Sequence, residues 1–321
     1  MVRKTQQCIL LAGATGYIGR HVAARLIDAG YTVVAISRSA DTRIAGCRVI
    51  TVDITQADAL QNALAGEQFD AIVSCIASRN GAPHDAWLVD HDANQHLLAA
   101  GQAAGARHFV LLSAICVQRP RLAFQQAKLA FETSLMNSGL RYSIVRPTAF
   151  FKSLSGQIAR VTAGKPFLVF GDGRQTACKP ISEQDLAQFI VDCLTDTDKH
   201  NQILPIGGPG DAITAREQGE LLFSLVGREP RFRQIPPVMF RVVAALLVPA
   251  GKLIPAIAAK AEFARIGHYY ATESMLVWNA AEHRYDAAAT PSTGSQTLTE
   301  HYRRILSDGI AGHDAGDHKL F

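Results

Sequence analysis

The stretch Cys8–Gly19 reads CILLAGATGYIG, a short apolar run followed by three glycines spaced as G-x-x-G-x-x-G. A strand that leads through a glycine turn into a helix is how Rossmann-type folds hold a dinucleotide. Gly13 would allow the tight turn, Gly16 the close approach of the pyrophosphate, and Gly19 the close packing of helix on strand. The N–H groups at the start of the helix would then face the diphosphate. The alternative is an ordinary glycine turn.

The next segments alternate between short apolar runs and longer helical patterns. Further strands are expected at Thr32–Ser37, Arg48–Val52, Ala71–Ile76, His108–Leu112 and Tyr142–Val145, and helices at Ile18–Ala29, Ala57–Ala65, Asp92–Ala104 and Phe124–Asn137. Unbroken Val/Ile/Leu runs are typical of parallel strands buried on both faces, and repeated alternation requires right-handed crossovers. The sequence therefore predicts an α/β fold, a Rossmann-type doubly wound parallel sheet with helices on both faces.

The end of the second predicted strand decides between two dinucleotides. An NAD site places an acidic residue about twenty positions after the glycines, but here the strand ends in Ile-Ser-Arg38-Ser39, with no acid before Asp41. Arg38 could stack on adenine and pair with the 2′-phosphate of NADP, and Ser39 could hydrogen-bond the same phosphate. Asp53, after the third strand, could hold the adenine amino group or cap the next helix. We therefore predict NADPH as the cofactor.

The pattern becomes less regular after Pro147, and this suggests two parts. We expect residues 1–150 to form an NADP-binding Rossmann domain, to which 182–206 return, and 151–181 and 207–321 to form a smaller, mostly helical substrate-binding region. Ser182 and Thr214 are placed to cap helices. The apolar segment Phe240–Ala259 allows three interpretations, namely a pair of core helices, a substrate lid, or a surface that meets a membrane. Core is the default.

The composition excludes several classes of protein. A formal net charge of +4 with scattered basic residues does not favour nucleic-acid binding. The six cysteines form no C-x-x-C pair, so they predict buried thiols in a reducing compartment, and we expect no metal site. Without an uninterrupted apolar stretch of about twenty residues, a membrane-spanning helix is not expected. Residues 1–7 run directly into the first strand, and this leaves no room for a targeting peptide.

The glycine spacing is similar to that of the extended and atypical families of the short-chain dehydrogenase/reductase superfamily. Those families carry a serine and a Tyr-x-x-x-Lys motif, in which tyrosine protonates a carbonyl oxygen and lysine holds the nicotinamide ribose. Here Ser113 follows the fifth strand, and the motif reads Phe124-Gln-Gln-Ala-Lys128. Phenylalanine cannot donate a proton, so carbonyl reduction loses its acid while reduction of a conjugated carbon–carbon double bond remains feasible. We predict Lys128 and Ser113 as catalytic residues; the alternative for Lys128 is a surface amine.

Seven longer segments carry a more specific resemblance. They read SCIASRNG at 74–81, HFVLLSAICVQ at 108–118, FQQAKLAFE at 124–132, YSIVRPTAFFKSL at 142–154, KPISEQDL at 179–186, LPIGGPG at 204–210 and IGHYYATESML at 266–276. With these segments the chain resembles, over nearly its whole length, the divinyl chlorophyllide 8-vinyl reductases, an atypical family of the same superfamily. Two alternatives are another double-bond reductase of the isoflavone-reductase-like group and a non-catalytic NADP-binding sensor.

The resemblance implies a reaction and a set of contacts. NADPH would reduce the C8 vinyl group of divinyl chlorophyllide or protochlorophyllide to ethyl, in chlorophyll or bacteriochlorophyll biosynthesis. The hydride would reach the terminal vinyl carbon, the charge would spread into the macrocycle, and Tyr269, Tyr270, Glu273 or a water would protonate the inner carbon. The predicted cofactor contacts are Gly13, Thr15, Gly16, Tyr17, Ile18, Gly19, Arg38, Ser39, Asp53, Lys128 and Pro147; the predicted substrate contacts are Phe150, Phe151, Arg79 and Tyr269.

The expected setting follows from the same resemblance. The lack of an N-terminal extension suggests a bacterial form rather than a plastid precursor, so we expect a cytoplasmic location, with Phe240–Ala259 as a candidate for peripheral contact with a membrane. The expected partner is a tetrapyrrole of low molecular weight, whose propionate could meet Lys152, Arg79 or Arg160. The oligomeric state is left open.

Overall fold

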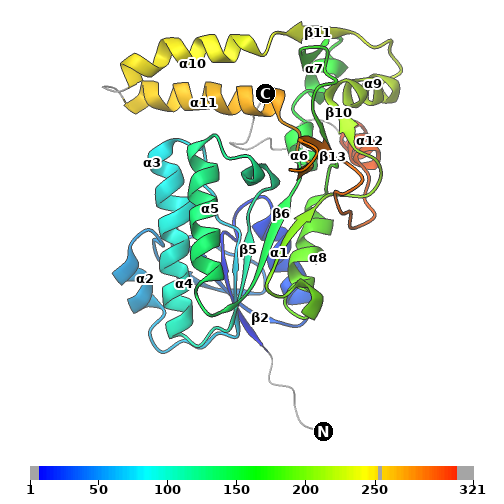
Figure 1. Ribbon diagram of the computed structural model, residues 1–321. Helices are drawn as coiled ribbons and strands as arrows, with labels where there is room; N and C mark the ends of the chain where they lie inside the picture. The colour runs from blue at the N-terminus through cyan, green and yellow to red at the C-terminus, as the bar shows by residue number, and fades with distance from the viewer. Residues whose placement is uncertain (1–6, 252–254, 309–321) are drawn as a thin grey trace.

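The computed structural model describes residues 7–251 and 255–308 (Figure 1). The prediction for the residues before the first strand falls mostly on residues 1–6, which lie outside the described residues. Within them, seven parallel strands form one sheet in the order β3-β2-β1-β4-β5-β6-β9. These strands are β1 (Cys8–Ala12), β2 (Thr32–Ser37), β3 (Cys47–Thr51), β4 (Ala71–Ser74), β5 (His108–Leu112), β6 (Arg141–Pro147) and β9 (Gln202–Ile206).

Helices cover both faces of this sheet. One face carries α1 (Gly19–Asp28) and α8 (Glu183–Asp192), and the other carries α2 (Ala57–Ala63), α4 (Ala93–Ala103) and α5 (Ala123–Met136). Alternate strand residues point to opposite faces, so Leu11 and Val73 pack under α1 and α8 while Leu10 and Ile72 pack under the other layer. The predicted doubly wound fold is confirmed.

One connection differs from the prediction. The helical segment expected at Asp92–Ala104 begins earlier, with α3 (Pro83–Ala86) and a π-helical turn at Trp87–Asp92 that leads directly into α4. Pro83 stands in the first turn of α3, where the missing N–H costs no hydrogen bond. The π-helical turn places the buried Asp90 beside α5, and π-helical turns often occur at functional sites.

A second lobe stands at the carboxyl end of the sheet (Figure 1). It holds α6 (Phe151–Leu154), α7 (Ile158–Thr162), β7 (Phe167–Phe170), β8 (Ala177–Cys178), β10 (Ile213–Thr214), α9 (Ala215–Leu225), β11 (Phe232–Ile235), β12 (Val277–Asn279), β13 (Arg284–Asp286) and α12 (Leu298–Asp308). Phe167, Phe223 and Tyr302 are central to its separate core. The predicted caps are confirmed, because the hydroxyls of Ser182 and Thr214 accept hydrogen bonds from the N–H groups of Asp185 and Glu217.

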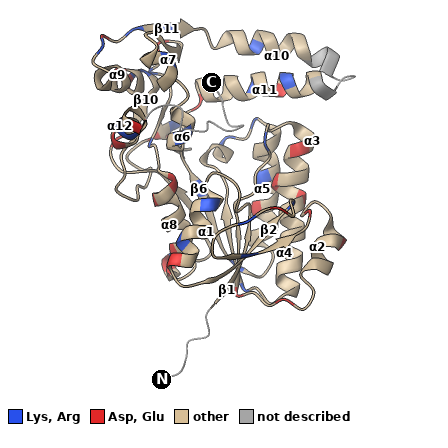
Figure 2. Cartoon of the chain, turned by 180° about the vertical axis from the view of Figure 1, so that it is seen from behind, with Lys and Arg blue, Asp and Glu red and all other residues tan. Residues whose placement is uncertain are grey.

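The apolar segment forms a helical hairpin of α10 (Val238–Gly251) and α11 (Pro255–Thr272) that crosses above the carboxyl end of the sheet (Figure 1). Several of its large side chains face solvent; Val242 is 53% exposed and Leu246 is 73% exposed. The default interpretation as core is therefore wrong for this face of α10. Few charged positions interrupt the hairpin (Figure 2). Across the described residues, no helix combines the length and apolar character that a membrane span needs.

Candidate active site

The glycine loop has the shape that a dinucleotide requires. Gly13 adopts a φ of +83°, and a Cβ there would lie 2.7 Å from the backbone carbonyl carbon of Cys75. A Cβ on Gly19 would lie 2.7 Å from the carbonyl carbon of Gly13, so α1 can approach β1 this closely only without a side chain. Thr15 and Gly16 are exposed at the top of the loop. This backbone cradle fits a diphosphate.

Two other residues of the loop point away from that cradle. The Ile18 side chain is buried in the core, so only its backbone could meet a cofactor. The Tyr17 hydroxyl donates to Glu183 Oε2 at 2.7 Å, and burial together with this carboxylate raises the pKa of Tyr17. The ammonium group of Lys152 lies 4.8 Å from the centre of the Tyr17 ring. Tyr17 thus connects the cofactor loop to α8 and α6.

The residues predicted to bind the adenine end of the cofactor lie at the ends of β2 and β3. Arg38 and Ser39 are exposed directly after β2. Asp53 Oδ1 accepts hydrogen bonds from the N–H and the hydroxyl of Thr55, at 3.0 and 2.8 Å. The bond from the Thr55 N–H is the main reason that the pKa of Asp53 lies below its ordinary value, and the charge of Arg38 adds to it. Asp53 does not cap α2, whose N-cap is Gln56.

Lys128 is buried and paired. Its ammonium group lies 2.8 Å from Asp90 Oδ1, and their side chains are only 10% and 0% exposed. The other oxygen of Asp90 accepts from the Ser78 hydroxyl at 2.6 Å. The alternative of a surface amine is therefore wrong. Because the Asp90 carboxylate fixes Lys128 near the end of β4, the ammonium group is held at the carboxyl edge of the sheet, where dinucleotides bind in this fold.

Ser113 is part of a second buried network. Its hydroxyl donates to Oε1 of Glu132, whose carboxylate is also bound by the Arg146 guanidinium. Ser113 and Glu132 are 6% and 1% exposed. The proton of the serine hydroxyl is thus donated to a carboxylate on α5. The arrangement ties the end of β5 to α5 and β6, and the predicted role of Ser113 on substrate stays a prediction.

An apolar cluster surrounds the position of the missing tyrosine. Phe124 packs with Cys116, Leu122, Ile266 and both tyrosines of α11. Tyr269 is 3% exposed and its hydroxyl donates to the Cys116 carbonyl at 2.8 Å. In the described part of the chain, the hydroxyl of the half-buried Tyr270 donates to the Cys116 sulfur, a weak acceptor, at 3.8 Å. Burial raises the pKa of both phenols, which keeps them protonated.

Glu273, the remaining candidate proton donor on the chain, is ionically paired. Its carboxylate accepts from Arg119 at 2.7 Å, from Arg121 at 2.9 Å and from the Tyr285 hydroxyl at 2.6 Å. The side chain is 5% exposed. Both carboxylate oxygens are therefore occupied by side chains of the protein, which hold this glutamate in place.

The remaining predicted contacts divide between the core and more exposed positions. Phe151 is 1% exposed and packs in the core of the second lobe, with its ring 5.1 Å from that of His301, so the prediction of a substrate contact there is not supported. Phe150 is half-buried and bridges to Ile181. Arg79 is exposed, while its backbone N–H donates to Asp85. Pro147 is the last residue of β6, two positions beyond the predicted end of that strand, and its contact with the cofactor stays a prediction.

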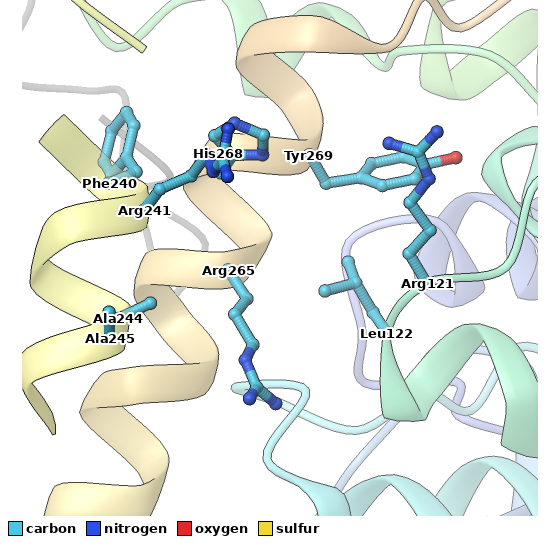
Figure 3. Close-up of a pocket in the computed structure, with 9 residues that line it drawn as sticks. All are labelled: Arg121, Leu122, Phe240, Arg241, Ala244, Ala245, Arg265, His268 and Tyr269. Atoms are coloured by element: carbon cyan, nitrogen blue, oxygen red, sulfur yellow. The ribbon is translucent and has the colours of Figure 1, made fainter. Parts of the chain in front are cut away.

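Sequence reasoning missed a basic pocket between the helical hairpin and the start of α5. We use this name for the cavity of about 310 Å³ whose polar lining is Arg121, Arg241, Arg265 and His268. Figure 3 shows these side chains coming from the segment before α5, from α10 and from α11. The four residues lie in three segments with no common motif, so no sequence signal indicated that they would meet.

Comparison with known proteins is consistent with this geometry. The sequence profile of an NAD(P)H-binding family matches residues 13–197. The chain is 46% identical to the chloroplastic divinyl chlorophyllide a 8-vinyl-reductase of Arabidopsis thaliana, over 96% of this chain and 79% of that protein. It is 47% identical to the protein of the same name from Cucumis sativus, over 98% of this chain and 79% of that protein. An Escherichia coli NADPH-dependent quinone oxidoreductase complexed with NADPH shares the fold, with a TM-score of 0.69 at 17% identity and coverage of 93% and 99%.

These comparisons overturn one expectation and settle another. Both plant relatives are named as chloroplastic, and this contradicts the expected cytoplasmic, bacterial location. The identity far exceeds that expected of proteins that share only a fold, and it extends over nearly the whole chain. The chain therefore belongs to the divinyl chlorophyllide a 8-vinyl-reductase family, within the NAD(P)H-binding fold that its glycine loop predicts.

Proposed function

We propose that this protein uses NADPH to reduce the 8-vinyl group of a divinyl chlorophyllide to an ethyl group. The observation that carries the proposal is the identity of 46–47% with vinyl reductases over nearly the whole chain. The same relationship sets aside the isoflavone-reductase-like and sensor alternatives. The division into an NADP-binding domain of residues 1–150 with 182–206, and a substrate-binding region of 151–181 with 207–321, is part of the proposal.

The residues available for the cofactor lie along the carboxyl edge of the sheet. The backbone of Gly13, Gly16 and Gly19 would hold the diphosphate, because the lack of side chains at Gly13 and Gly19 lets the loop close tightly and leaves its N–H groups at the start of α1. The exposed Arg38 and Ser39 would bind the 2′-phosphate, to which a guanidinium offers paired, charge-assisted hydrogen bonds. When bound, NADPH supplies the hydride that the vinyl group takes up.

Lys128 would hold the ribose next to the nicotinamide. The salt bridge to Asp90 fixes one of its three N–H donors and the direction of the ammonium group, and the other donors are available to ribose hydroxyls. Asp90 is itself held by Ser78, so the geometry is set before a cofactor arrives. Ser113, bonded to Glu132, is proposed as a positioning residue for this edge of the sheet.

The macrocycle would lie between the start of α5, the loop 78–82 and α11. A Cβ on Gly81 would lie 2.8 Å from the Ile266 side chain and 3.4 Å from that of Phe124, so the three elements meet at this point. The faces of Phe124 and Tyr270 offer the apolar, aromatic surface that a flat conjugated ligand requires. Phe150, Arg79 and Tyr269 remain the predicted substrate contacts.

Tyr270 is our proposed proton donor to the inner vinyl carbon. Its hydroxyl is protonated and, among the described residues, is placed against a weakly accepting sulfur, whereas that of Tyr269 is bound to the Cys116 carbonyl and Glu273 is held by Arg119 and Arg121. A phenol with a raised pKa is a weak acid, yet it can protonate a carbanion, which is a much stronger base. The delocalised macrocycle would hold the charge until this transfer.

The proposal is tested by incubating purified protein with NADPH and divinyl chlorophyllide. Loss of the vinyl group from conjugation shifts the Soret absorption band to shorter wavelength, and NADPH is consumed in equal amount. A protein that binds NADPH but leaves the Soret band unchanged would contradict the function.

Contact of α10 with a membrane surface is also a proposal. The exposed side chains of Val242 and Leu246 on α10, with Phe263 on the neighbouring α11, support it, because an amphipathic helix binds an interface through apolar side chains of this kind. Flotation with lipid vesicles should recover the protein, and Leu246→Glu should reduce the recovery. Unchanged flotation of that variant would contradict the proposal.

A further inference from the structure

The basic pocket combines cations with an apolar wall. Arg121, Arg241 and Arg265 line it together with Leu122 and Tyr269, and no acidic side chain is among the lining residues that the structure describes. Figure 3 shows Arg265 and Leu122 extending into the space between α11 and the start of α5. A site of this composition suits a largely apolar ligand with one anionic group.

The charge of this region exceeds what its acids neutralise. Arg119 and Arg121 share the single carboxylate of Glu273, and Arg265 lies 3.3 Å from Glu262. Arg241 has no acidic partner within the described part of the chain. Four arginines against two glutamates leave a formal charge of +2 around the pocket. An anion that enters would therefore meet a guanidinium free to bind it with paired hydrogen bonds.

His268 lies in the same pocket and interacts with two of its arginines. Burial is the main reason that its pKa lies below the ordinary value, and the charges of Arg241 and Arg121 lower it further. The carboxylate of Glu273 acts in the opposite direction, as the acid that faces this histidine. The imidazole is thus neutral near pH 7 and the cations of the pocket are its arginines.

The basic pocket also lies at a suitable distance from Lys128, which is proposed to hold the ribose next to the nicotinamide. Leu122 lines the pocket and is the N-cap of α5. Lys128 lies on that helix, six residues later. A helix rises 1.5 Å per residue, so the two are separated by roughly 9 Å along the axis. This is of the order of the width of a tetrapyrrole. On a chlorophyllide the free propionate lies across the macrocycle from the C8 vinyl group.

We propose that the basic pocket binds the free propionate of the chlorophyllide and thereby selects the acid over its ester. Arg241 and Arg265 would bind the carboxylate directly, while Arg121 is held toward the pocket by Glu273. The pocket of about 310 Å³ would take the carboxylate-bearing edge, and the remaining macrocycle would extend along Leu122 and Tyr269 toward Phe124. This inference rests on the proposed function and adds to it the residues that distinguish the free acid from the ester.

The experiment compares divinyl chlorophyllide with its propionate methyl ester. Equilibrium binding is measured by quenching of pigment fluorescence, and KM is measured with saturating NADPH. The wild type should bind the acid about tenfold or more tightly than the ester, since a charge-assisted pair to arginine is lost on esterification. Arg241→Ala should weaken binding of the acid to the level of the ester and leave ester binding unchanged.

Two further variants separate charge from folding. Arg241→Lys keeps the charge and should retain part of the discrimination. Arg303→Ala removes an exposed arginine on α12, outside the pocket, and should behave as the wild type. Equal unfolding midpoints for all three variants exclude misfolding as the cause of a change.

The outcomes distinguish the two proposals. If the wild type reduces neither pigment, the proposed function fails. If it reduces both with equal KM, or if Arg241→Ala weakens the acid and the ester alike, the function stands and the propionate site is wrong. Loss of binding to anionic vesicles by Arg241→Ala, with the preference for the acid unchanged, would assign the arginines to a lipid surface and overturn the proposal.

Discussion

The buried pair of Lys128 and Asp90 makes the strongest prediction about stability. Asp90→Asn keeps the shape of the side chain but removes its charge, and the ammonium group then remains buried without a counter-ion. With side chains only 10% and 0% exposed and an ion pair of 2.8 Å, solvent cannot compensate. Removing one partner of a buried pair costs about 3–5 kcal/mol, so we expect a loss in this range in the free energy of unfolding.

A neighbouring pair supplies the matched control. Asp92 lies in the same π-helical turn and its carboxylate is 2.7 Å from His91, but its side chain is 49% exposed. Asp92→Asn should therefore cost less than about 1 kcal/mol. A double variant, Asp90→Asn with Lys128→Met, removes the orphaned charge and should recover most of the loss.

Urea unfolding followed by circular dichroism measures these differences, with the slope m checked for constancy. A loss below about 1 kcal/mol for Asp90→Asn would refute the reasoning, because the ammonium group would then be solvated in the folded protein. A double variant no more stable than the single one would refute it as well.

Four other predictions follow from the site and the core. Arg38→Ala should raise the Kd for NADPH about tenfold but not that for NADH, and a fluorescence titration that finds equal effects would contradict a 2′-phosphate site. Gly19→Ala should abolish NADPH binding and lower Tm, since its Cβ would meet the backbone of Gly13. Calorimetry with and without NADPH measures this, and a variant whose Tm still rises on adding NADPH as much as that of the wild type would contradict it. Tyr270→Phe should lower kcat about 100-fold with little change in KM, whereas equal activity would point to water as the donor. Burial lowers the pKa of His108 to about 3, so its contribution to stability is present above pH 6.5 and is lost as the pH falls toward 3; His108→Gln should flatten this slope in acid unfolding, and an unchanged slope would contradict it.

The sequence was most informative where one local pattern determines the structure. The run Cys8–Ala12 is apolar without alternation, so a strand with both faces buried is its stable state, and Gly13 is needed where the turn has a positive φ. Ser182 and Thr214 cap helices because their hydroxyls reach N–H groups three residues later. These interactions span only a few residues, and their predictions are confirmed.

Long-range pairings could not be predicted in the same way. Lys128 meets Asp90, 38 positions earlier, because a π-helical turn places the acid beside α5, and no periodicity in the sequence indicates such a turn. The arginines of the basic pocket meet only after the hairpin folds over the sheet. Of the neighbours Phe150 and Phe151, only Phe151 enters the core, and the local sequence could not say which of the two would do so.

The chemistry follows from how the retained groups are used. In this chain the tyrosine position holds Phe124, the Ser113 hydroxyl donates to Glu132, and the Lys128 ammonium is paired with Asp90. None of the three is directed as an oxyanion donor toward a substrate carbonyl, so a ketone would gain no stabilisation for its developing charge. A conjugated macrocycle delocalises the developing charge over its own π-system. In the proposed reaction the protein then needs only to align the pigment over the nicotinamide and provide one proton, and the apolar cluster that contains Phe124 and Tyr270 is suited to that task.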